Sequence, residues 1–536
     1  MKTIFNIFVL NLLFSSVICE IYSFSNDKFD THLHWHEENY KKCRNQSSMN
    51  NCYDYIIIGA GTAGSILARK LSDNPQNKVL LIEEGYWLSL NPQVQNASQW
   101  YSIRFDPLIE RGYVSTLQAG FGYRSIPIPR AKGTGGTNSM NGMVFIIGNR
   151  KDFDERWGPI NGWSWNDLSS YWKSIQKTIS PSPLDPKHPL IQKLIKSATE
   201  NGGVSTRIHM AKKISDNYAE RMSSWNAYIQ PILPRKNLDI LVFTQVTKIL
   251  FDKSLRSIGV TTYNIGKKEY IYFYSRKEII LSAGVFDTPK LLLLSGIGPC
   301  NELIKHNIKC LADVPGVGKN LQDHTFLELH STPLRNQNIS LPKNIFGTWG
   351  VIAIEENGEY YHGLQIGEIN GIYKIQIFVE TFHYTSRGSI TLFDKNPFSK
   401  PIINPNFLSN SYDINKTLHS VQVARKFLLS KSISELIEKF NKFNIPSFHI
   451  NDEKKLLQWI KENIKSDAHP SSTCSMGNNF QDNHMIVVNP RLKVRHTKQL
   501  RIADGSIIPY LISGNPNQIT MIIGMKAAEM ILEDNN

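Results

Sequence analysis

Beyond residue 50 the chain alternates short apolar runs with a glycine-rich turn. Residues 53–58 (YDYIII) are β-branched and aromatic, which is typical of a buried parallel strand. Residues 65–71 (SILARKL) have the composition of a helix, and residues 78–82 (KVLLI) form a second strand-like run. The order strand, helix, strand predicts a βαβ unit and therefore an α/β domain with a parallel sheet.

Two later stretches predict further elements. Residues 386–392 (SRGSITL) favour a strand, and residues 416–440 favour a helix because apolar side chains recur there at helical spacing. These apolar residues are Leu418, Val421, Val423, Phe427 and Leu428. Beyond the N-terminal segment, no apolar stretch is long enough to cross a bilayer, so we expect no membrane span in the mature chain.

The glycine-rich turn between the first strand and helix has the spacing of a dinucleotide site. Gly59, Gly61 and Gly64 allow, in turn, a tight turn, a close approach of backbone to a pyrophosphate, and contact of helix with strand. Thr62 and Ala63 begin the helix, whose N-terminal amides favour phosphate. Glu83 ends the second strand, where its carboxylate can accept hydrogen bonds from a ribose. The pattern alone does not separate FAD from NAD.

Residues 1–19 (MKTIFNIFVLNLLFSSVIC) have the pattern of a secretory signal peptide, with Lys2 before an apolar stretch and cleavage before Glu20. The alternative is a signal anchor that stays in the membrane. We favour cleavage because the apolar stretch is about 15 residues long, shorter than the ~20 of a spanning helix. The protein is therefore expected to be secreted. Glycosylation sequons at Asn45, Asn96, Asn338 and Asn415 fit secretion.

The cysteines also fit an oxidising compartment. Cys43 with Cys52, and Cys300 with Cys310, are close enough in sequence to form local disulfides, which leaves Cys474 as a buried thiol. No CxxC pair indicates a zinc ribbon. The alternating histidines at 32, 34 and 36 can suggest a metal site, but without a fourth ligand we favour a polar N-terminal arm.

Composition excludes several classes of protein. In 536 residues, 41% are hydrophobic and 20% are charged, which is ordinary for a folded globular chain. The 60 Lys and Arg residues exceed the 46 Asp and Glu residues, for a net charge of +14. These positive charges are scattered along the chain, so we expect a solvated basic surface and no nucleic-acid partner.

Three further stretches resemble one enzyme family. They are residues 129–157 (PRAKGTGGTNSMNGMVFIIGNRKDFDERW), 281–299 (LSAGVFDTPKLLLLSGIGP) and 314–324 (VPGVGKNLQDH). With the glycine turn they closely resemble the glucose–methanol–choline (GMC) oxidoreductases, which bind FAD. The likeness runs in the family's order from about residue 53 to 532.

The resemblance implies an FAD site built from several segments. Beyond the glycine turn and Glu83, the positions that match the family's cofactor site are Gly136, Thr137, Asn141, Gly142, Met143, Val144, Val246, Asp504, Gly505, Asn517 and Gln518. Some relatives link FAD covalently through a histidine where this chain has Met140. Because methionine cannot form that bond, non-covalent FAD is expected.

The resemblance also implies a catalytic pair. Residues 468–477 (AHPSSTCSMG) match the stretch that carries the family's base, which places it at His469. Residues 513–520 (SGNPNQIT) match the stretch with the second active-site residue, a histidine or asparagine in the family and Asn515 here. Asn517 or Gln518 could instead face the substrate. We expect His469 to take the hydroxyl proton and Asn515 to donate a hydrogen bond to the substrate oxygen.

The family's order implies a discontinuous FAD-binding Rossmann-like α/β domain and an α+β substrate domain with an antiparallel sheet. After the signal and an N-terminal arm over 20–51, the FAD domain is expected at 52–160, 226–330 and 466–536. The substrate domain is expected at 161–225 and 331–465. The stretch 287–290 (DTPK) departs from the family's usual Ser-Pro-Gln, which leaves the packing at the flavin edge open.

The function implied is a secreted FAD-dependent alcohol oxidase or dehydrogenase. Hydride would pass from the alcohol carbon to flavin N5, giving an aldehyde or ketone, or an acyl cyanide from an α-hydroxynitrile. The reoxidant would be O₂ or a quinone-like compound. The alternative is an FAD-containing hydroxynitrile lyase without net redox, which a single active-site histidine disfavours. Sequence does not identify the substrate.

Overall fold

The computed structural model describes residues 28–45, 49–181, 189–200, 211–215, 218–338, 360–369, 371–438, 452–481 and 483–535. The expected signal peptide, residues 1–19, lies outside the described residues. Among the helices of the described chain, none is both long enough and apolar enough to cross a membrane.

A seven-stranded mixed sheet forms the larger half of the molecule. Its strand order is β5-β2-β1-β8-β7-β6, and β18 pairs with the end of β8. The bounds are β1 Cys52–Ile58, β2 Val79–Ile82, β5 Leu238–Leu241, β6 Thr244–Phe251, β7 Ser257–Asn264, β8 Glu269–Leu281 and β18 Leu500–Ile502. The pairs β1–β2, β1–β8, β2–β5 and β8–β18 are parallel, whereas β6, β7 and β8 pair antiparallel.

The predicted βαβ unit is present. β1 is buried at every position, and α3, Thr62–Leu71, follows Gly61 directly. The apolar run of β1 is buried because β1 lies between β2 and β8 inside the sheet and α3 packs on it. β1, β8 and β18 end level with one another, since Ile58 and Ile502 both pair with Leu281. Ligands of open α/β sheets bind outside this carboxyl edge.

Two long helices form a layer with α3, which packs on β1 and β2. α13, Pro516–Asn535, lies against α3 and against α6, Trp165–Ile179. Ser164 and Asp167 form a capping box at the start of α6, and a proline at the first position of α13 suits a helix N-terminus. Leu168, Ile175 and Ile179 bury the apolar stripe of α6 in the core of this half, although residues 161–225 were assigned to the substrate domain.

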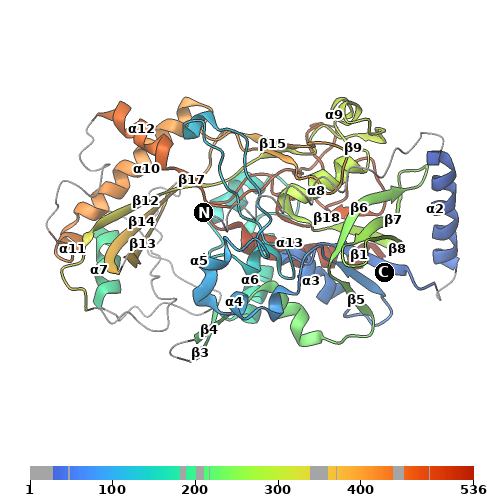
Figure 1. Ribbon diagram of the computed structural model, residues 1–536, viewed down its shortest axis with the longest axis horizontal. Helices are drawn as coiled ribbons and strands as arrows, with labels where there is room; N and C mark the ends of the chain where they lie inside the picture. The colour runs from blue at the N-terminus through green and yellow to red at the C-terminus, as the bar shows by residue number, and fades with distance from the viewer. Residues whose placement is uncertain are drawn as a thin grey trace, which may run out of the picture.

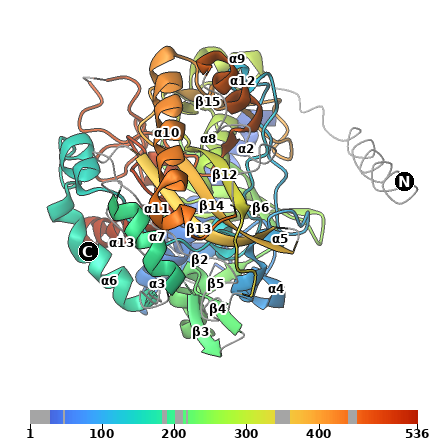
Figure 2. The same cartoon turned by 90° about the vertical axis from the view of Figure 1, so that its left-hand side faces the viewer.

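A second, fully antiparallel sheet lies at the other end of the long axis (Figure 1). Its order is β13-β14-β12-β17, with bounds β12 Thr325–Pro333, β13 Tyr360–Ile369, β14 Ile372–Thr381 and β17 Lys465–Ser466. Figure 2 shows α10, Ser411–Leu429, and α11, Lys431–Ser434, in front of these strands. α7, Pro189–Glu200, and α12, Glu453–Asn463, complete the helical cover. This arrangement is the α+β half that the sequence predicted.

The helix predicted over 416–440 is wrong in its limits. It begins five residues earlier, at Ser411, because Asn410 accepts the amide of Asp413 as its cap, and it stops at Leu429. Ser430 is extended and separates α10 from α11. The strand predicted over 386–392 is present as β15, Gly388–Thr391.

The remaining elements are short. They are η1 Leu88–Leu90, α4 Pro92–Gln95, η2 Ala97–Gln99, α5 Trp100–Ile103, η3 Ala119–Phe121, η4 Gly136–Ser139, η5 Asp152–Trp157, β3 Ala211–Ser215, β4 Tyr218–Arg221, η6 Trp225–Ile229, η7 Gln230–Ile232, α8 Gly284–Leu294, β9 Ile297–Gly298, α9 Cys300–Lys305, β10 Ala312–Asp313, β11 Lys319–Leu321, β16 Ile402–Asn404 and η8 Gly505–Ile507. β11, β15 and β16 form a three-stranded sheet.

Both predicted disulfides are present. Cys43 bonds to Cys52, which ties α2, Lys28–Asn45, to the start of β1, and Cys300 bonds to Cys310. Cys474 is a free, buried thiol, and burial raises its pKa.

The N-terminal arm is a helix that packs on the sheet. The Nδ1 atom of His36 is 3.0 Å from the hydroxyl of Tyr274 on β8, whereas His34 is exposed and pairs with Glu38. His34 and His36 therefore point to different surroundings, which does not suit a shared metal ion.

Candidate active site

A cavity opens at the carboxyl edge of the large sheet and extends to the second sheet. Its empty volume is about 2240 Å³, part of it open to solvent. The wall includes Gly59 after β1, Ser282 after β8 and Asp504 after β18, as the level strand ends require. On the opposite side it includes Phe326 of β12 and Phe378 of β14. The cavity therefore lies between the two halves of the molecule.

The glycine turn has no room for side chains at Gly59 and Gly64. A Cβ atom at Gly59 would lie 2.4 Å from the carbonyl oxygen of Ser282, and one at Gly64 would lie 1.9 Å from the carbonyl oxygen of Gly59. Gly136 has φ of +55°, and a Cβ atom there would lie 2.8 Å from the Cα atom of Gly61. The turn after β1 and the start of η4 thus pack backbone against backbone, which leaves bare amides beside the cavity.

Glu83 is held at the end of β2 in an acceptor position. Its carboxylate accepts the backbone amides of Ala60 at 3.0 Å and Gly85 at 2.9 Å. Burial raises the pKa of Glu83, although the positive charge of Arg111 opposes this effect. This geometry presents a fixed acceptor to the cavity, as binding of ribose hydroxyls requires.

Asp504 is a second buried acceptor at the same edge. Its Oδ2 atom accepts the backbone amide of Gly284 at 2.9 Å and the hydroxyl of Thr288 at 2.6 Å. Burial raises its pKa, and the bonds from Ser506 and Thr288 oppose the rise. The carboxylate thereby fixes the start of α8 against the loop after β18, and Gly505 lines the cavity beside it.

Most of the predicted cofactor residues line this one cavity. They are Gly59, Gly61, Thr62, Ala63, Glu83, Gly136, Thr137, Asn141, Gly142, Met143, Val144, Val246, Asp504, Gly505 and Asn517. Two others do not line it. Gly64 serves the packing of α3 on β1, and Gln518 is buried and donates its side-chain amide to the carbonyl of Val144 at 3.0 Å. The Asn517 side chain accepts the hydroxyl of Thr62 at 3.0 Å.

His469 and Asn515 meet in the same cavity. The Nε2 atom of His469 is 2.9 Å from the Nδ2 atom of Asn515, and both residues are part of the wall. Asn515 directly precedes α13, so the fixed start of that helix positions its side chain. The sequence-predicted pair is therefore together, and a substrate oxygen that replaces their mutual hydrogen bond can contact both polar atoms.

The loop that carries His469 is fixed through its backbone. Asp323, just before β12, accepts the backbone amide of His469 at 2.8 Å and the hydroxyl of Ser466 at 2.6 Å. Arg130 donates to the carbonyl of Ala468, whose φ is +59°. Burial raises the pKa of Asp323 to about 6, with Ser466, His469 and Arg130 opposing the rise.

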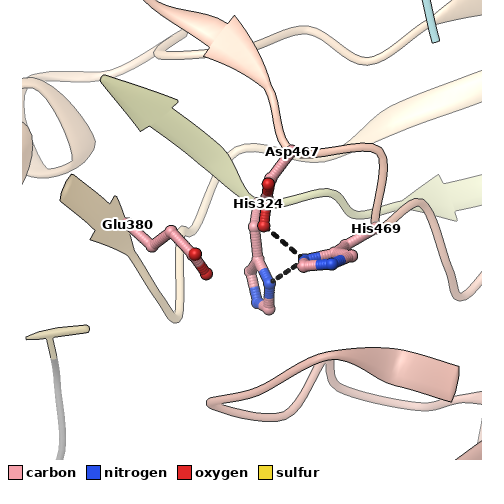
Figure 3. Close-up of side chains that lie close together, drawn as sticks. All are labelled: His324, Glu380, Asp467 and His469. Atoms are coloured by element: carbon pink, nitrogen blue, oxygen red, sulfur yellow. Dashed lines mark hydrogen bonds and ion pairs between the residues drawn. The ribbon is translucent and has the colours of Figure 1, made fainter. Parts of the chain in front are cut away.

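The far side of the His469 ring faces three titratable groups that the sequence did not single out (Figure 3). Its Nδ1 atom is 2.8 Å from Oδ2 of Asp467 and 3.1 Å from Nδ1 of His324. Glu380 of β14 completes the group, and the donor atoms of all four residues lie within 4.8 Å of one another. Two histidines and two carboxylates can bind a metal, but an ion between the rings would have to break their direct contact.

Burial determines the charges in this group. Burial lowers the pKa of His324 well below its usual value, and the neighbouring histidines add to this effect, so His324 is neutral at pH 7. Burial also raises the pKa of Glu380 well above its usual value, with further rises from the charge of Asp467 and from a hydrogen bond to it. Burial and the charge of Asp467 therefore both favour the neutral form of the Glu380 carboxyl.

A buried arginine that the sequence analysis missed holds the loop after Gly136. Arg221 is fully buried, and its Nη1 atom donates to the carbonyls of Asn138 and Asn141 at 3.2 and 2.8 Å. Its Nε atom donates to the carbonyl of Val94 at 3.1 Å. Burial lowers the pKa of this arginine to about 9. No motif indicates this role, because the contact joins positions 80 residues apart.

The loop before Asn515 is held by Asp152. The Oδ2 atom of Asp152 accepts the backbone amide of Ser513 at 2.7 Å, and its Oδ1 atom lies 2.7 Å from Nε2 of His383. Asp152 lies in the stretch 129–157 that carries the family resemblance, but the resemblance assigned no role to this carboxylate.

The departure at residues 287–290 has a local explanation. Asp287 accepts the hydroxyl of Tyr113 at 2.7 Å and lies 3.5 Å from Arg111, which also pairs with Glu84 at 2.7 Å. Asp287 thus belongs to a partly buried charge network on the cavity wall, and the fold is unaffected.

Two family models match the chain. The N-terminal model of the GMC oxidoreductases matches residues 53–326, and the C-terminal model matches residues 385–524. This protein is a GMC oxidoreductase. Like the family, it is an FAD-dependent oxidoreductase that acts on CH–OH donors.

Individual relatives agree with this assignment. The GMC chain is 28% identical to an alcohol dehydrogenase [acceptor] of Pseudomonas putida, over 90% of this chain and 96% of that protein. It is 30% identical to an oxygen-dependent choline dehydrogenase of Brucella anthropi, over 89% of this chain and 95% of that protein. Among solved structures, pyridoxine 4-oxidase from Mesorbium loti has the same fold, with a TM-score of 0.77 at 22% identity over 89% of this chain and 98% of that one.

The cavity of this GMC oxidoreductase fits FAD by its own chemistry. The bare amides around Gly59, Gly61 and Gly136 suit a pyrophosphate, because a side chain at Gly59 or Gly136 would collide with backbone. The fixed carboxylate of Glu83 suits ribose hydroxyls. His469 and Asn515 line the same cavity, so a dinucleotide held by the glycine turn and the two polar side chains share one space.

Proposed function

We propose that the protein is a secreted FAD-dependent alcohol oxidase or dehydrogenase in which His469 takes the hydroxyl proton of the substrate. The observation that carries this proposal is the contact of 2.9 Å between His469 Nε2 and Asn515 Nδ2 in the wall of the FAD cavity. Asn515 donates a hydrogen bond to the substrate oxygen and cannot itself serve as the base.

Bound FAD supplies the hydride acceptor. The chain supplies the proton acceptor and the orientation: Nε2 of His469 accepts the proton of the substrate hydroxyl, and Asn515 Nδ2 stabilises the negative charge that develops on the oxygen. The aromatic residues Trp100, Phe326 and Phe378 line the same cavity and favour an alcohol with an apolar group beside its carbinol carbon. The product is an aldehyde or a ketone.

The experiment that tests this proposal is anaerobic mixing of the holoprotein with a panel of primary, benzylic and amino alcohols. A substrate bleaches the flavin, and His469→Ala should lower the rate of bleaching by about 10² to 10⁴. Bleaching at an unchanged rate in that variant would contradict the role of His469. Release of cyanide from an α-hydroxynitrile while the flavin stays oxidised would instead favour a lyase.

The ratio of oxygen consumed to peroxide formed identifies the electron acceptor. Oxygen uptake that matches the peroxide formed supports an oxidase with O₂ as acceptor. Slow oxygen uptake together with fast reduction of a quinone dye supports a dehydrogenase. Of the two relatives named above, one is an acceptor-linked alcohol dehydrogenase and the other is an oxygen-dependent choline dehydrogenase.

Non-covalent FAD is part of the proposal. Met140 lines the cavity and is buried at 2% exposure, and its thioether cannot form the bond through which some relatives hold FAD. Acid precipitation should therefore leave the flavin in the supernatant. Flavin that stays with the protein pellet would contradict this.

Secretion is supported by sequence features and chemistry. The segment 1–19 has a signal pattern, two disulfides are formed, and the sequon asparagines Asn45, Asn338 and Asn415 are exposed. Asn96 is half-buried and caps η2. Expression in a eukaryotic secretory host should give a protein in the medium that begins at Glu20 and loses mass on treatment with an N-glycosidase. Retention in cells with Met1 intact would contradict the proposal.

A further inference from the structure

The geometry points to Asp467 as a positioning residue that holds His469 in the tautomer needed of a base at Nε2. This inference rests on the proposed function of His469 and deepens it. Asp467 does not touch the substrate in this role and acts through the ring of His469.

The contact with Asn515 determines the tautomer of His469. A side-chain amide nitrogen can only donate hydrogen bonds, so the contact of Asn515 Nδ2 with Nε2 makes Nε2 the acceptor. A neutral imidazole carries one N–H group, which must then be on Nδ1. The lone pair that a base needs is on the nitrogen that lies beside Asn515.

Two groups lie next to the N–H group at Nδ1 of His469. The carboxylate oxygen of Asp467 is 2.8 Å from Nδ1, and Nδ1 of the neutral His324 is 3.1 Å away. The hydrogen bond of Nδ1 is made with His324. Asp467 lies beside Nδ1 as an anion without a hydrogen bond to it, and its charge favours the N–H group at that nitrogen. The opposite tautomer would place a lone pair on Nδ1 against an anion and would leave Nε2 without its lone pair.

Proton transfer to Nε2 gives the ring of His469 a positive charge. When the O–H bond of the alcohol breaks, its proton forms an N–H bond at Nε2 and the electron pair stays on the oxygen. The ring then carries N–H groups on both nitrogens and one positive charge. Asp467 keeps its negative charge and lies beside that cation, so its attraction is strongest when the proton has moved.

Neighbouring groups keep Asp467 in place. Glu380 forms a side-chain hydrogen bond with Asp467, and the backbone amide of Asp467 donates to the carbonyl of His324 at 3.0 Å. The other charged groups that face this loop are Asp323, Arg130 and Arg104. Because the charge of Asp467 also acts on the pKa of Glu380, Asp323 and Arg104, the test includes a measurement on the His469 ring itself.

The test compares Asp467→Asn with the wild-type holoprotein by anaerobic flavin reduction. The substitution keeps the size of the side chain and removes its charge, and we expect the rate to fall on the order of 10²-fold or more. The acid limb of the pH–rate profile should also move to lower pH, because the ring cation loses its anion. Glu328→Gln is the matched control, since Glu328 pairs with Lys465 in the same sheet.

A double-mutant comparison separates positioning from folding. In a His469→Ala background, Asp467→Asn should have no further effect on flavin reduction, because a positioning residue acts only through the ring. Equal losses in both backgrounds would overturn the inference. A rate for Asp467→Asn in the range of the Glu328→Gln control would also overturn it. If His469→Ala itself reacts at the normal rate, the proposed function fails first.

An NMR measurement of the His469 ring and a chemical rescue of the rate complete the test. Nitrogen-15 NMR of the resting protein should show the hydrogen of the His469 ring on Nδ1, and Asp467→Asn should move part of the population to Nε2–H. An unchanged tautomer in that variant would overturn the inference. Asp467→Ala, which leaves space beside Nδ1, should regain part of its rate in formate, whereas the Glu328→Gln control should not respond. Absence of rescue in a variant with normal FAD content would count against the carboxylate.

Discussion

The Nε2 atom of His469 and the Nδ2 atom of Asn515 lie 2.9 Å apart, although 46 positions separate the two residues in the chain. Each is held by a different device. The backbone amide of His469 is bound by Asp323, and Asn515 stands at the start of a buried helix. The distance between them is thus set by the rigid frame around both and not by the pair itself.

Loss of the Asn515 amide should slow the reaction without removing the base. A hydrogen bond to a charged group contributes about 1.5–3 kcal/mol, so Asn515→Ala should lower the rate of flavin reduction by about 10- to 150-fold. Anaerobic stopped-flow absorbance of the flavin measures this. Asn301→Ala, a change at an exposed helical position, is the control and should leave the rate unchanged. A loss as large as that of His469→Ala would contradict the division of roles.

Crowding at Gly136 should prevent cofactor binding. Gly136→Ala places a Cβ atom 2.8 Å from the Cα atom of Gly61 at a φ of +55°, so the backbone beside the pyrophosphate site must move. We expect the purified variant to carry little FAD, measured as the ratio of flavin to protein absorbance. Gly266→Ala, in an exposed turn with ordinary contact distances, should keep the wild-type ratio. Full FAD occupancy in Gly136→Ala would contradict this prediction, because it would show that the backbone of the turn can move to make room for the Cβ atom.

Removal of Arg221 should destabilise the loop that contains Asn138 and Asn141. Arg221→Met keeps an apolar chain but leaves the carbonyls of Asn138 and Asn141 without their donor, at a cost of about 1–3 kcal/mol for each unpaired group. The variant should unfold at a lower temperature and release FAD sooner in a thermal ramp followed by flavin fluorescence. Arg150→Met, at a side chain with 71% exposure, is the control. Equal thermograms for the two variants would contradict the role of Arg221.

Acid should selectively weaken the ion pairs on the cavity wall. Burial alone raises the pKa of Glu84, but the charges of Arg111 and Lys132 outweigh it and lower the pKa to about 2. A carboxyl whose pKa is lower in the folded chain stabilises it fully above its unfolded value near 4.5, and this stabilisation is lost as the pH falls toward 2.

Urea titrations of Glu84→Gln test this sign. At pH 6 the variant should be less stable than wild type by about 3 kcal/mol, and the difference should shrink steadily as the pH falls below 4.5. Glu269→Gln, whose pair with Lys267 is exposed, should show almost no difference at any pH. A difference for Glu84→Gln that does not change with pH would contradict the ion-pair interpretation.

Local pattern was sufficient for several parts of this protein. The apolar run of β1, the glycine spacing and the apolar run of β2 encode a βαβ unit through short-range geometry, because a strand, a tight turn and a helix each need particular residues at adjacent positions. The disulfide pairs are also local, nine and ten positions apart. The limits of α10 were harder to predict, since its cap at Asn410 lies outside the apolar pattern.

The sequence by itself determined the family and the glycine turn, and it predicted His469 and Asn515 as the catalytic pair, because each is carried by a contiguous motif. Only the tertiary structure decided what surrounds them. Asp467 and His324 on the far side of the ring, and Arg221 behind the loop of Asn141, have no distinguishing spacing in the chain. Arg221 contacts Asn141 and His324 contacts His469 across 80 and 145 positions of the chain. Asp467 is only two positions from His469, and the conformation of that loop brings its carboxylate to the ring. Desolvation changes the charge of such groups only once the two halves of the fold have closed around them.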